Sequence, residues 1–156
     1  MSLFTTRCTV IPAEYNTPGK ERELLSEVVT LLSGEVVSVI EEAEENAVLI
    51  YSHDKDNSER PEQHRLLVAA RNVSEHTKIL ASYGEGILTL VVKDGAELRF
   101  CNAFEAVDFV TALYYTFLAL SGMQINIAAS TLYIGTPLSK EDKITALTYF
   151  KRVESL

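Results

Sequence analysis

The chain has 156 residues and a formal net charge of -8, and hydrophobic residues make up 47% of it. This length is enough for one hydrophobic core of ordinary size, and the composition excludes a disordered or low-complexity protein. The acidic balance also disfavours nucleic acid as a partner, because the average surface repels phosphate and the most basic segment, residues 140–152, carries Glu141 and Asp142.

The cysteines and the longest apolar segment bear on where the protein works. Cys8 and Cys101 lie far apart, without the short spacing of metal or redox motifs, and no leader peptide precedes the first strand. The longest apolar window, residues 109–120, is shorter than the roughly twenty residues that cross a bilayer. We therefore expect a reduced, cytoplasmic protein without a membrane span.

The first third of the chain predicts a strand, a helix and a pair of strands. Residues 7–11 form a strand closed by Pro12, and residues 21–32 carry apolar side chains at helical spacing, with Gly34 as the stop. Residues 35–40 and 47–51 are β-branched runs, which indicate an antiparallel pair.

Four glutamates lie between these two runs, at Glu41, Glu42, Glu44 and Glu45. A run of this kind is able to gather Ca²⁺ or Mg²⁺. We expect a solvated turn instead, because the Asp/Asn/Gly spacing of a calcium loop is missing.

Residues 54–61 are the most polar stretch and predict a mobile loop. We interpret this loop as a boundary between the end of a first lobe, residues 4–56, and a second lobe, residues 57–156, with one compact domain as the alternative. The apolar spacing of residues 62–73 then favours a helix, although residues 66–70 also fit a buried strand.

The second lobe begins with three strands in succession. Residues 78–83 predict the first, and residues 86–92 and 97–104 flank a Lys93-Asp94-Gly95 turn whose Asp-Gly pair is typical of a tight hairpin. Together they form a β-meander.

A helix, a strand and a second helix follow the meander. The first helix is expected at residues 105–121, the strand at 131–134, and the last helix from its cap at Ser139 through residue 152. The inner face of the first helix is expected to carry Val110, Leu113, Phe117 and Leu120. The fold class is therefore α/β, a mixed sheet with a β-meander followed by α-β-α.

The polar residues show no catalytic motif. We expect His53, His64 and His76 at the surface, because none accompanies a nucleophile. A cluster of carboxylates at strand ends and at the helix start fits either acid/base chemistry or ordinary turn and helix-start roles, which we favour. Its members are Asp94, Glu97, Glu105 and Asp108.

Two glycine-containing segments, residues 82–86 and 134–137, loosely resemble phosphate cradles. Neither has the P-loop pattern or a basic residue, and Glu85 repels phosphate, so we interpret both as tight turns.

Aromatic residues around the central helix exceed what one core face hides, which indicates association with another protein or with a further copy. The expected interaction surface consists of Phe109, Tyr114, Tyr115 and Phe117. Tyrosines Tyr83, Tyr114, Tyr115 and Tyr133 also allow a pocket for a small molecule.

Three short patterns carry a resemblance to a known family. They are Ile87-Leu-Thr-Leu-Val-Val-Lys-Asp-Gly95, Leu98-Arg-Phe-Cys-Asn-Ala-Phe104, and Asp108-Phe109 with Tyr114-Tyr115. Together with residues 4–14, they resemble an uncharacterised Bacteroidetes family with an actin-like ATPase fold, related to ribonuclease H. The resemblance implies a chain without the opening strands of the first lobe.

The resemblance also implies a nucleotide site for ATP with Mg²⁺. Its glycines correspond to Gly84, Gly86 and Gly135, with Asp94 or Asp108 near the metal ion. Two departures stand out: residues 82–86 lack the Asp of an actin-type site, and residues 134–136 have one glycine where two are usual. We therefore expect a non-catalytic interaction or assembly module, with a complete or degenerate nucleotide-binding ATPase as the alternative.

Overall fold

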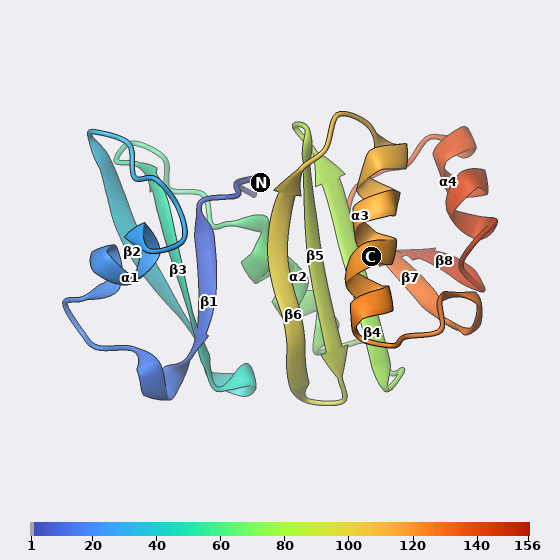
Figure 1. Cartoon of the computed structure of the whole chain (residues 1–156), viewed down its shortest axis with the longest axis horizontal. Helices are drawn as coiled ribbons and strands as arrows, with labels where there is room; N and C mark the ends of the chain where they lie inside the picture. The colour runs from blue at the N-terminus through green and yellow to red at the C-terminus, as the bar shows by residue number, and fades with distance from the viewer. Residues whose placement is uncertain (1) are drawn as a thin grey trace.

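A computed structural model describes residues 2–156 and arranges them in two β-sheets with helices beside them (Figure 1). The first sheet has the order β1-β3-β2, with both neighbouring pairs antiparallel. Its strands are β1 (Cys8–Pro12), β2 (Glu35–Glu42) and β3 (Ala47–Asp54). The antiparallel pair expected on either side of the four glutamates is confirmed.

The first helix is shorter than its apolar spacing predicts. Helix α1 (Glu21–Ser26) buries Leu25 against β3, and the chain then leaves the helix. The next positions include the consecutive β-branched residues Val28, Val29 and Thr30, which disfavour helix. The predicted extension to residue 32 is therefore wrong.

The second sheet has the order β6-β5-β4-β7-β8. Strands β4, β5 and β6 form the expected antiparallel meander, and β7 and β8 extend it in parallel with β4. Their bounds are β4 (Thr77–Gly84), β5 (Ile87–Asp94), β6 (Glu97–Glu105), β7 (Thr131–Ile134) and β8 (Arg152–Ser155). The mixed α/β fold is confirmed.

Strand β8 was not predicted, because the last helix was expected to continue to residue 152. Helix α4 (Lys140–Leu147) begins at its cap, where the Ser139 hydroxyl accepts a hydrogen bond from the Asp142 N–H, but it ends five residues early. Phe150 and Val153 are then buried against the sheet. A four-residue strand with one buried side chain leaves no alternating pattern to detect.

Helix α3 (Phe109–Gly122) lies on the outer face of the second sheet (Figure 1). It starts later than predicted because β6 continues to Glu105, and the Asp108 carboxylate caps it by accepting from the Thr111 N–H. The side chains buried beneath it are Phe109, Ala112, Leu113, Thr116 and Leu120. Val110, which was expected on that inner face, points outward, because a helix that is apolar nearly all round does not reveal its inner face.

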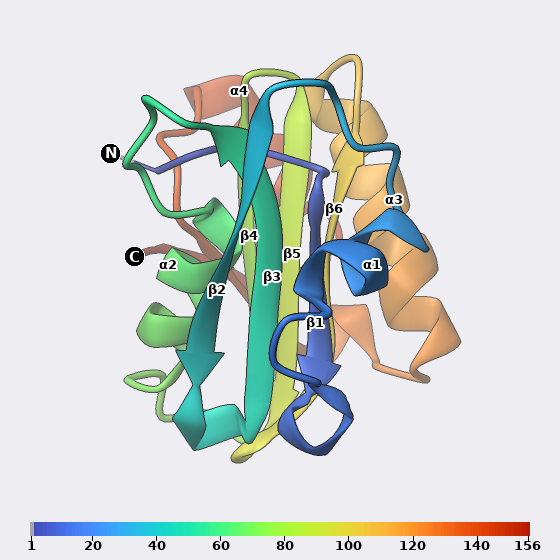
Figure 2. The same cartoon turned by 90° about the vertical axis from the view of Figure 1, so that its left-hand side faces the viewer.

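The two sheets lie one in front of the other when seen from the side of the first (Figure 2). Helix α2 (Glu62–Ala70) lies beside the space between them, behind β1 and β6 in Figure 1 and at the left in Figure 2, after a polar connection over residues 55–61. The helix predicted from residue 62 is confirmed, and the alternative strand over residues 66–70 is not formed. Between the sheets, Leu49 and Tyr51 of β3 share one core with Leu66, Leu80 and Val91. Three short 3₁₀ helices complete the structure: η1 (Ala13–Tyr15), η2 (Ala43–Glu45) and η3 (Ile127–Ala129).

The glutamate run between β2 and β3 is not the solvated turn that was expected. Glu41 and Glu44 are exposed, but the Glu42 and Glu45 side chains are almost fully excluded from water. Arg71 pairs with both carboxylates, at 2.8 Å and 2.7 Å, and Lys93 pairs with Glu45. The prediction was wrong because these cations come from α2 and β5, far away in the sequence.

Candidate functional site

The outer side of α3 is an exposed apolar stripe. Val110 is 61% exposed, Tyr114 58% and Leu118 53%, and the spacing of four residues places them on one side of the helix. Val107, just before the helix, extends the stripe at 87% exposure. No described element lies in front of α3 in Figure 1. A row of large apolar side chains is therefore exposed to solvent. Single exposed apolar residues are common on protein surfaces, but a contiguous row of them is not.

The stripe continues onto α4 and the residues that follow it. The ring of Phe117 contacts that of Tyr149, with 4.8 Å between centroids, and also packs on Phe150. Beside this contact, Ile144, Leu147 and Tyr149 are about half exposed. We call the combined surface the α3–α4 face, made of Val107, Val110, Tyr114, Leu118, Ile144, Leu147 and Tyr149.

The four aromatic residues predicted for an interaction surface take different places. Tyr114 lies at the centre of the stripe, and Phe117 lies at its border with α4. Tyr115 is half-buried and packs against Phe104 of β6, with 6.0 Å between ring centroids. Phe109 is buried against Tyr83 and belongs to the core, because the first turn of α3 directs it at the sheet.

The predicted glycines gather at one end of the second sheet, where β4 and β7 both end. The Gly135 N–H donates to the Ala81 carbonyl at 2.9 Å, and the Tyr83 N–H donates to the Thr136 hydroxyl at 3.0 Å, which brings Gly84 close to Gly135. At this end the Gly86 carbonyl accepts from Ala106. The carboxyl ends of parallel strands are common ligand sites in α/β proteins.

The two predicted metal-binding carboxylates do not come together. Asp108 lies at the glycine end of the sheet, where hydrogen bonds from Thr111 lower its pKa. Asp94 lies at the opposite end of the β5–β6 hairpin, where a hydrogen bond from Arg99 lowers its pKa. The nine residues of β6 separate them by roughly 30 Å of strand. One ion therefore has at most one of them as a ligand.

Protein atoms occupy the space beside two of the glycines. A Cβ at Gly84 would lie 2.9 Å from the ring of Phe4, and a Cβ at Gly135 would overlap the Ser82 hydroxyl and the Arg65 guanidinium. Gly86 has a positive φ of 72°, which suits the tight turn between β4 and β5. Close packing thus explains Gly84 and Gly135 without a ligand.

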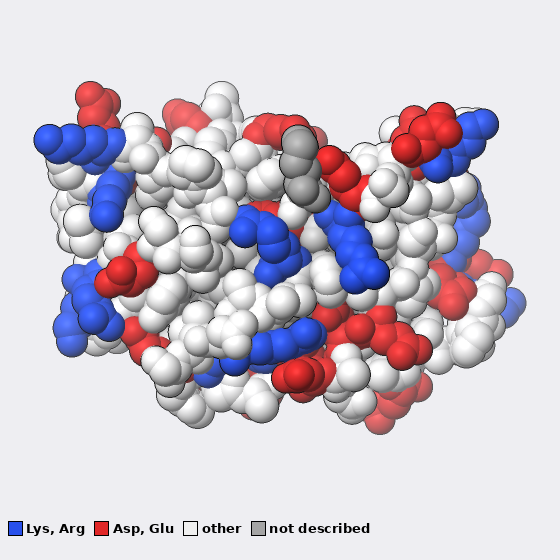
Figure 3. All heavy atoms as spheres, turned by 180° about the vertical axis from the view of Figure 1, so that it is seen from behind, with Lys and Arg blue, Asp and Glu red and all other residues white. Residues whose placement is uncertain are grey.

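A hollow of about 600 Å³ opens next to these glycines at the start of α2. Arg60, His64 and Arg65 line it, on the rear of the molecule, where basic side chains gather near the middle of the surface (Figure 3). Arg65 binds the buried Glu62 carboxylate, which raises the pKa of Arg65, and it also donates to the Gly135 carbonyl at 2.6 Å. Sequence reasoning missed Arg65, whose one local signal is its i,i+3 spacing from Glu62.

Two polar atoms near this hollow are buried without a hydrogen-bond partner. They are the Ser82 hydroxyl, beside Gly135 and Arg65, and the Gln63 side-chain oxygen in the first turn of α2. A buried polar atom without a partner is costly, so each is a candidate contact for a water molecule or a ligand.

The three histidines do not all lie at the surface as expected. His64 is partly buried, and its Nδ1 is 2.5 Å from the buried Glu42 carboxylate. His53 lies 2.7 Å from the Ser38 hydroxyl and stacks on Tyr51. Among residues 2–156, no group of three or more His, Cys, Asp or Glu side chains surrounds a common point.

The comparison with solved structures identifies the fold. The chain is similar to a crystal structure, at 1.85 Å resolution, of a Bacteroides thetaiotaomicron protein described as having an actin-like ATPase fold and unknown function. The match has a TM-score of 0.79 and 17% sequence identity, and it covers 98% of this chain. The chain has an actin-like fold. The match confirms the expected resemblance at the level of the fold. The chain spans 66% of the length of that protein.

Sequence comparisons add no further relative. No protein-family model matches the chain, and no curated protein matches it. None of the helices described within residues 2–156 has the length and apolar character needed to span a membrane.

Proposed function

We propose that this actin-like domain is a protein-interaction module that binds its partner through the α3–α4 face. The observation that carries this proposal is the uninterrupted apolar outer side of α3, with three large side chains more than half exposed in successive turns. Apolar patches of this kind on soluble proteins commonly mark interfaces. We expect the protein to work in the cytoplasm, with its two thiols reduced.

The chemistry of the patch supports binding more than catalysis. Helix α3 has no charged residue between Phe109 and Gly122, and the aromatic rings of Tyr114 and Tyr149 offer large contact areas at low entropic cost. Covering such a surface with another apolar surface favours association by about 25 cal/mol for each Å² of apolar area removed from water.

Photo-crosslinking in the cells that express the protein tests this proposal. We replace Tyr114 with p-benzoylphenylalanine, and as a matched control we place the same residue at Val28, which is 62% exposed beyond α1. The expected result is a discrete protein adduct from position 114 and none from position 28. Adducts of equal yield from both positions, or from neither, would contradict the proposal.

Nucleotide binding at the glycine end of the sheet is the second candidate. The observation that favours it is the hollow at the start of α2, which Arg60, His64 and Arg65 line together with Glu62, the partner of Arg65, in a chain whose net charge is -8. The unpartnered Ser82 hydroxyl is not part of this lining but lies beside Arg65 and Gly135. This donor set fits a phosphate group. Gly84, Gly86 and Gly135 lie around the strand ends, and Asp108 is the predicted metal-binding carboxylate on that side.

Thermal unfolding with ATP and Mg²⁺ tests the second candidate. A ligand at 100 times its dissociation constant stabilises a protein by about 2.7 kcal/mol, so a bound nucleotide raises the melting temperature measurably. Arg60→Gln removes one exposed basic side chain from the hollow and should reduce the shift, whereas Arg22→Gln, on α1, should leave it unchanged. No shift at millimolar nucleotide ends this candidate.

A further inference from the structure

We propose that the outer edge of strand β2 binds an extended segment of another protein, which pairs with β2 as an added strand of the first sheet. The segment carries β-branched side chains along its length and a lysine or arginine beside Glu41. This surface is separate from the α3–α4 face, so the inference goes beyond the proposed function and does not depend on it. The backbone hydrogen bonds of the first sheet, the protection of the other edge strands and the charges along β2 support it.

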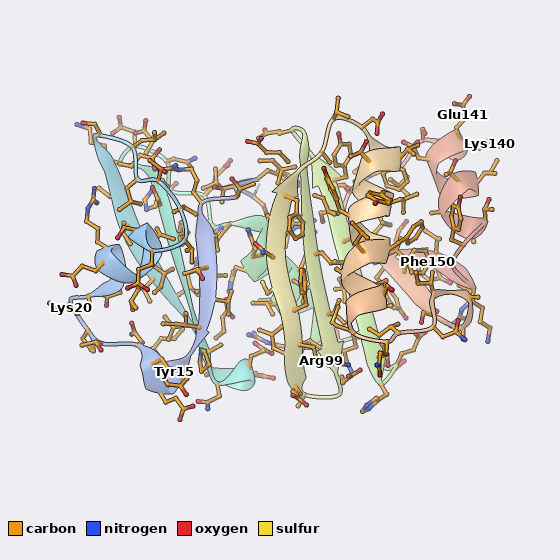
Figure 4. The ribbon with its side chains drawn as sticks, viewed as in Figure 1. Tyr15, Lys20, Arg99, Lys140, Glu141 and Phe150 are labelled. Carbon is orange, nitrogen blue, oxygen red and sulfur yellow. The ribbon has the colours of Figure 1, made fainter. Side chains whose placement is uncertain are left out.

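The outer edge of β2 is open. Strand β2 lies at the margin of the first sheet, and no described strand lies beyond it (Figure 2). Helix α1, which begins after the labelled Lys20 in Figure 4, lies in front of the sheet in that view and packs Leu25 against one face of β3. On the other face, Ile40 of β2 packs against the core that includes Leu66 of α2. The two helices therefore cover the faces of the sheet and leave this edge free.

The backbone groups on this edge can be identified from the pairing of β3. The Ser52 N–H of β3 donates to the Arg7 carbonyl, so the backbone of Ser52 faces the β1 side of the sheet. Because successive residues of a strand bond to opposite sides, Tyr51 faces β2, where it lies opposite Ser38. The same alternation along β2 directs the N–H and carbonyl groups of three residues away from β3. They are Val37, Val39 and Glu41.

The first outward residue of β2 has partners, whereas the next three do not. The Glu35 N–H donates to the Leu32 carbonyl and the Glu35 carbonyl accepts from the Arg22 guanidinium, both at 3.4 Å. Within residues 2–156, no hydrogen bond of this kind reaches Val37, Val39 or Glu41. Their N–H donors and carbonyl acceptors have the spacing that an added strand matches. This pattern specifies a strand as the occupant, which an apolar surface alone does not do.

The other three edge strands are protected against such pairing. Strand β1 has five residues and ends in Pro12, which has no N–H. Strand β6 has an irregularity at Arg99, which is skipped between the partners of Val92 and Lys93. Strand β8 has four residues. Strand β2, in contrast, has eight residues in unbroken register with β3 and contains no proline or lysine. An edge of this kind invites aggregation unless a specific strand covers it.

The charges along β2 favour a basic segment of another protein over a second copy. Glu41 and Glu44 are exposed, and none of the ion pairs formed within residues 2–156 includes either of them. Glu35 is already paired with Arg7. Strand β2 has three glutamates and no basic residue, so a second β2 supplies no cation to Glu41. An antiparallel pair of copies centred on Val39 also places Glu41 diagonal to Glu35 of the second copy, and like charges disfavour such a pairing.

The side chains of β2 set the composition of the segment. Val36 and Val39 project on opposite faces of the strand, and each is 38% exposed. An added strand with β-branched side chains on both of its faces covers the two valines. Beside Glu41 the same strand needs a lysine or an arginine.

Amide hydrogen exchange, measured residue by residue by NMR with a synthetic strand as the probe, tests this inference. The probe is the peptide acetyl-Lys-Val-Thr-Val-Thr-Val-Lys-amide, whose two lysines place one near Glu41 in either strand direction. At millimolar peptide, we expect the amides of Val37, Val39 and Glu41 to exchange more slowly by about tenfold or more. The amides of Ser38 and Ile40, which already bond to β3, should change little. This alternation is the signature of an added strand.

Two controls separate strand pairing from unspecific adsorption. The same peptide methylated on its valine and threonine nitrogens lacks the N–H donors of both edges and should give no protection. Glu41→Lys should weaken binding of the lysine peptide about threefold, and it should strengthen binding of a peptide with glutamate at both ends by a similar factor. Glu27→Lys is the matched control, since it makes the same charge change at an exposed residue beyond α1 and should leave both affinities unchanged. Circular dichroism establishes that each variant is folded.

Three results would overturn the inference: no slowing at millimolar peptide, slowing that does not alternate along β2, or equal slowing by the methylated peptide. If the amides of Val37, Val39 and Glu41 are already protected in the free protein and lose this protection on dilution, a second copy covers the edge and the inference is also overturned. None of these results bears on the α3–α4 face, which crosslinking at position 114 tests separately.

Discussion

Lys93 of β5 and Glu45 of η2 form an ion pair of 2.6 Å that joins the two sheets while both side chains are almost completely excluded from water. Glu45 also accepts from Arg71 of α2, so one carboxylate links the first sheet, the second sheet and the helix between them. A buried carboxylate is tolerated only when its partners compensate for lost hydration. This network therefore fixes how the two halves of the chain sit against each other.

We expect Glu45→Gln to destabilise the fold by about 3–5 kcal/mol, because it leaves Lys93 buried with no carboxylate opposite. Urea unfolding measures the loss. Glu44→Gln is the matched control, since Glu44 is exposed and surface substitutions change stability by about 0.5 kcal/mol or less. Equal stability of the two variants would show that the ion pair does not join the sheets. The double variant Glu45→Leu with Lys93→Met should recover part of the loss, because it removes both charges together.

The same carboxylate predicts how stability depends on pH. Burial raises the pKa of Glu45, but hydrogen bonds from Arg71 and Lys93 lower it by more, so the folded-state pKa lies below the ordinary value of 4.5. A depressed folded-state pKa means that the stabilisation is complete above the unfolded-state value and is lost as the pH falls through the folded-state value. We expect the free energy of unfolding to decrease below about pH 4.5. The decrease should be smaller in Glu45→Gln than in the wild type, and parallel curves would contradict the assignment.

Two glycines predict opposite effects of the same substitution. Gly135→Ala places a methyl group against the Ser82 hydroxyl and Arg65, and we expect it to cost about 1–3 kcal/mol. Gly122→Ala at the end of α3 meets no atom within 4 Å, so we expect it to stabilise by about 0.5–1 kcal/mol. Thermal unfolding of both variants gives the comparison. If Gly135→Ala is as stable as the wild type, the packing of Arg65 onto this strand end is looser than the structure describes.

The thiols should be unreactive in the folded protein. Burial raises the pKa of Cys8 and Cys101, and the nearby Glu42 carboxylate raises both further, so the reactive thiolate is scarce near neutral pH. We expect an aromatic disulfide reagent at pH 8 to modify both cysteines at least a hundredfold more slowly in buffer than in denaturing urea. Fast modification of Cys8, which is the buried one of the two, would mean that the space between the sheets opens readily.

Local sequence signals determined most of the elements that follow residue 61. The Asp94-Gly95 turn, the β-branched runs around it and the Ser139 cap each act within a few residues, so the meander and the starts of α2, β7 and α4 could be read from the chain. Prediction failed where a segment was too short, or its pattern of apolar and polar residues too uniform, to indicate its structure. The four residues of β8 form a strand only because β7 lies alongside. Val110 could not be told from an inner residue, because α3 has no charged residue to mark its outer side.

The burial of Glu42 and Glu45 could not be predicted, because their partners Arg71 and Lys93 become neighbours only when the two sheets stack. The candidate sites show the same division. An excess of aromatic residues is visible in the sequence, yet only the direction of α3 over the sheet buries Phe109 and exposes Tyr114. Likewise the glycines near 84 and 135 are visible as turns, whereas the pairing of β4 with β7 brings them together. The length of β6 in the β5–β6 hairpin separates Asp94 from Asp108. Residue types and short spacings thus determined the elements, and long-range packing decided which side chains meet each other and which meet water.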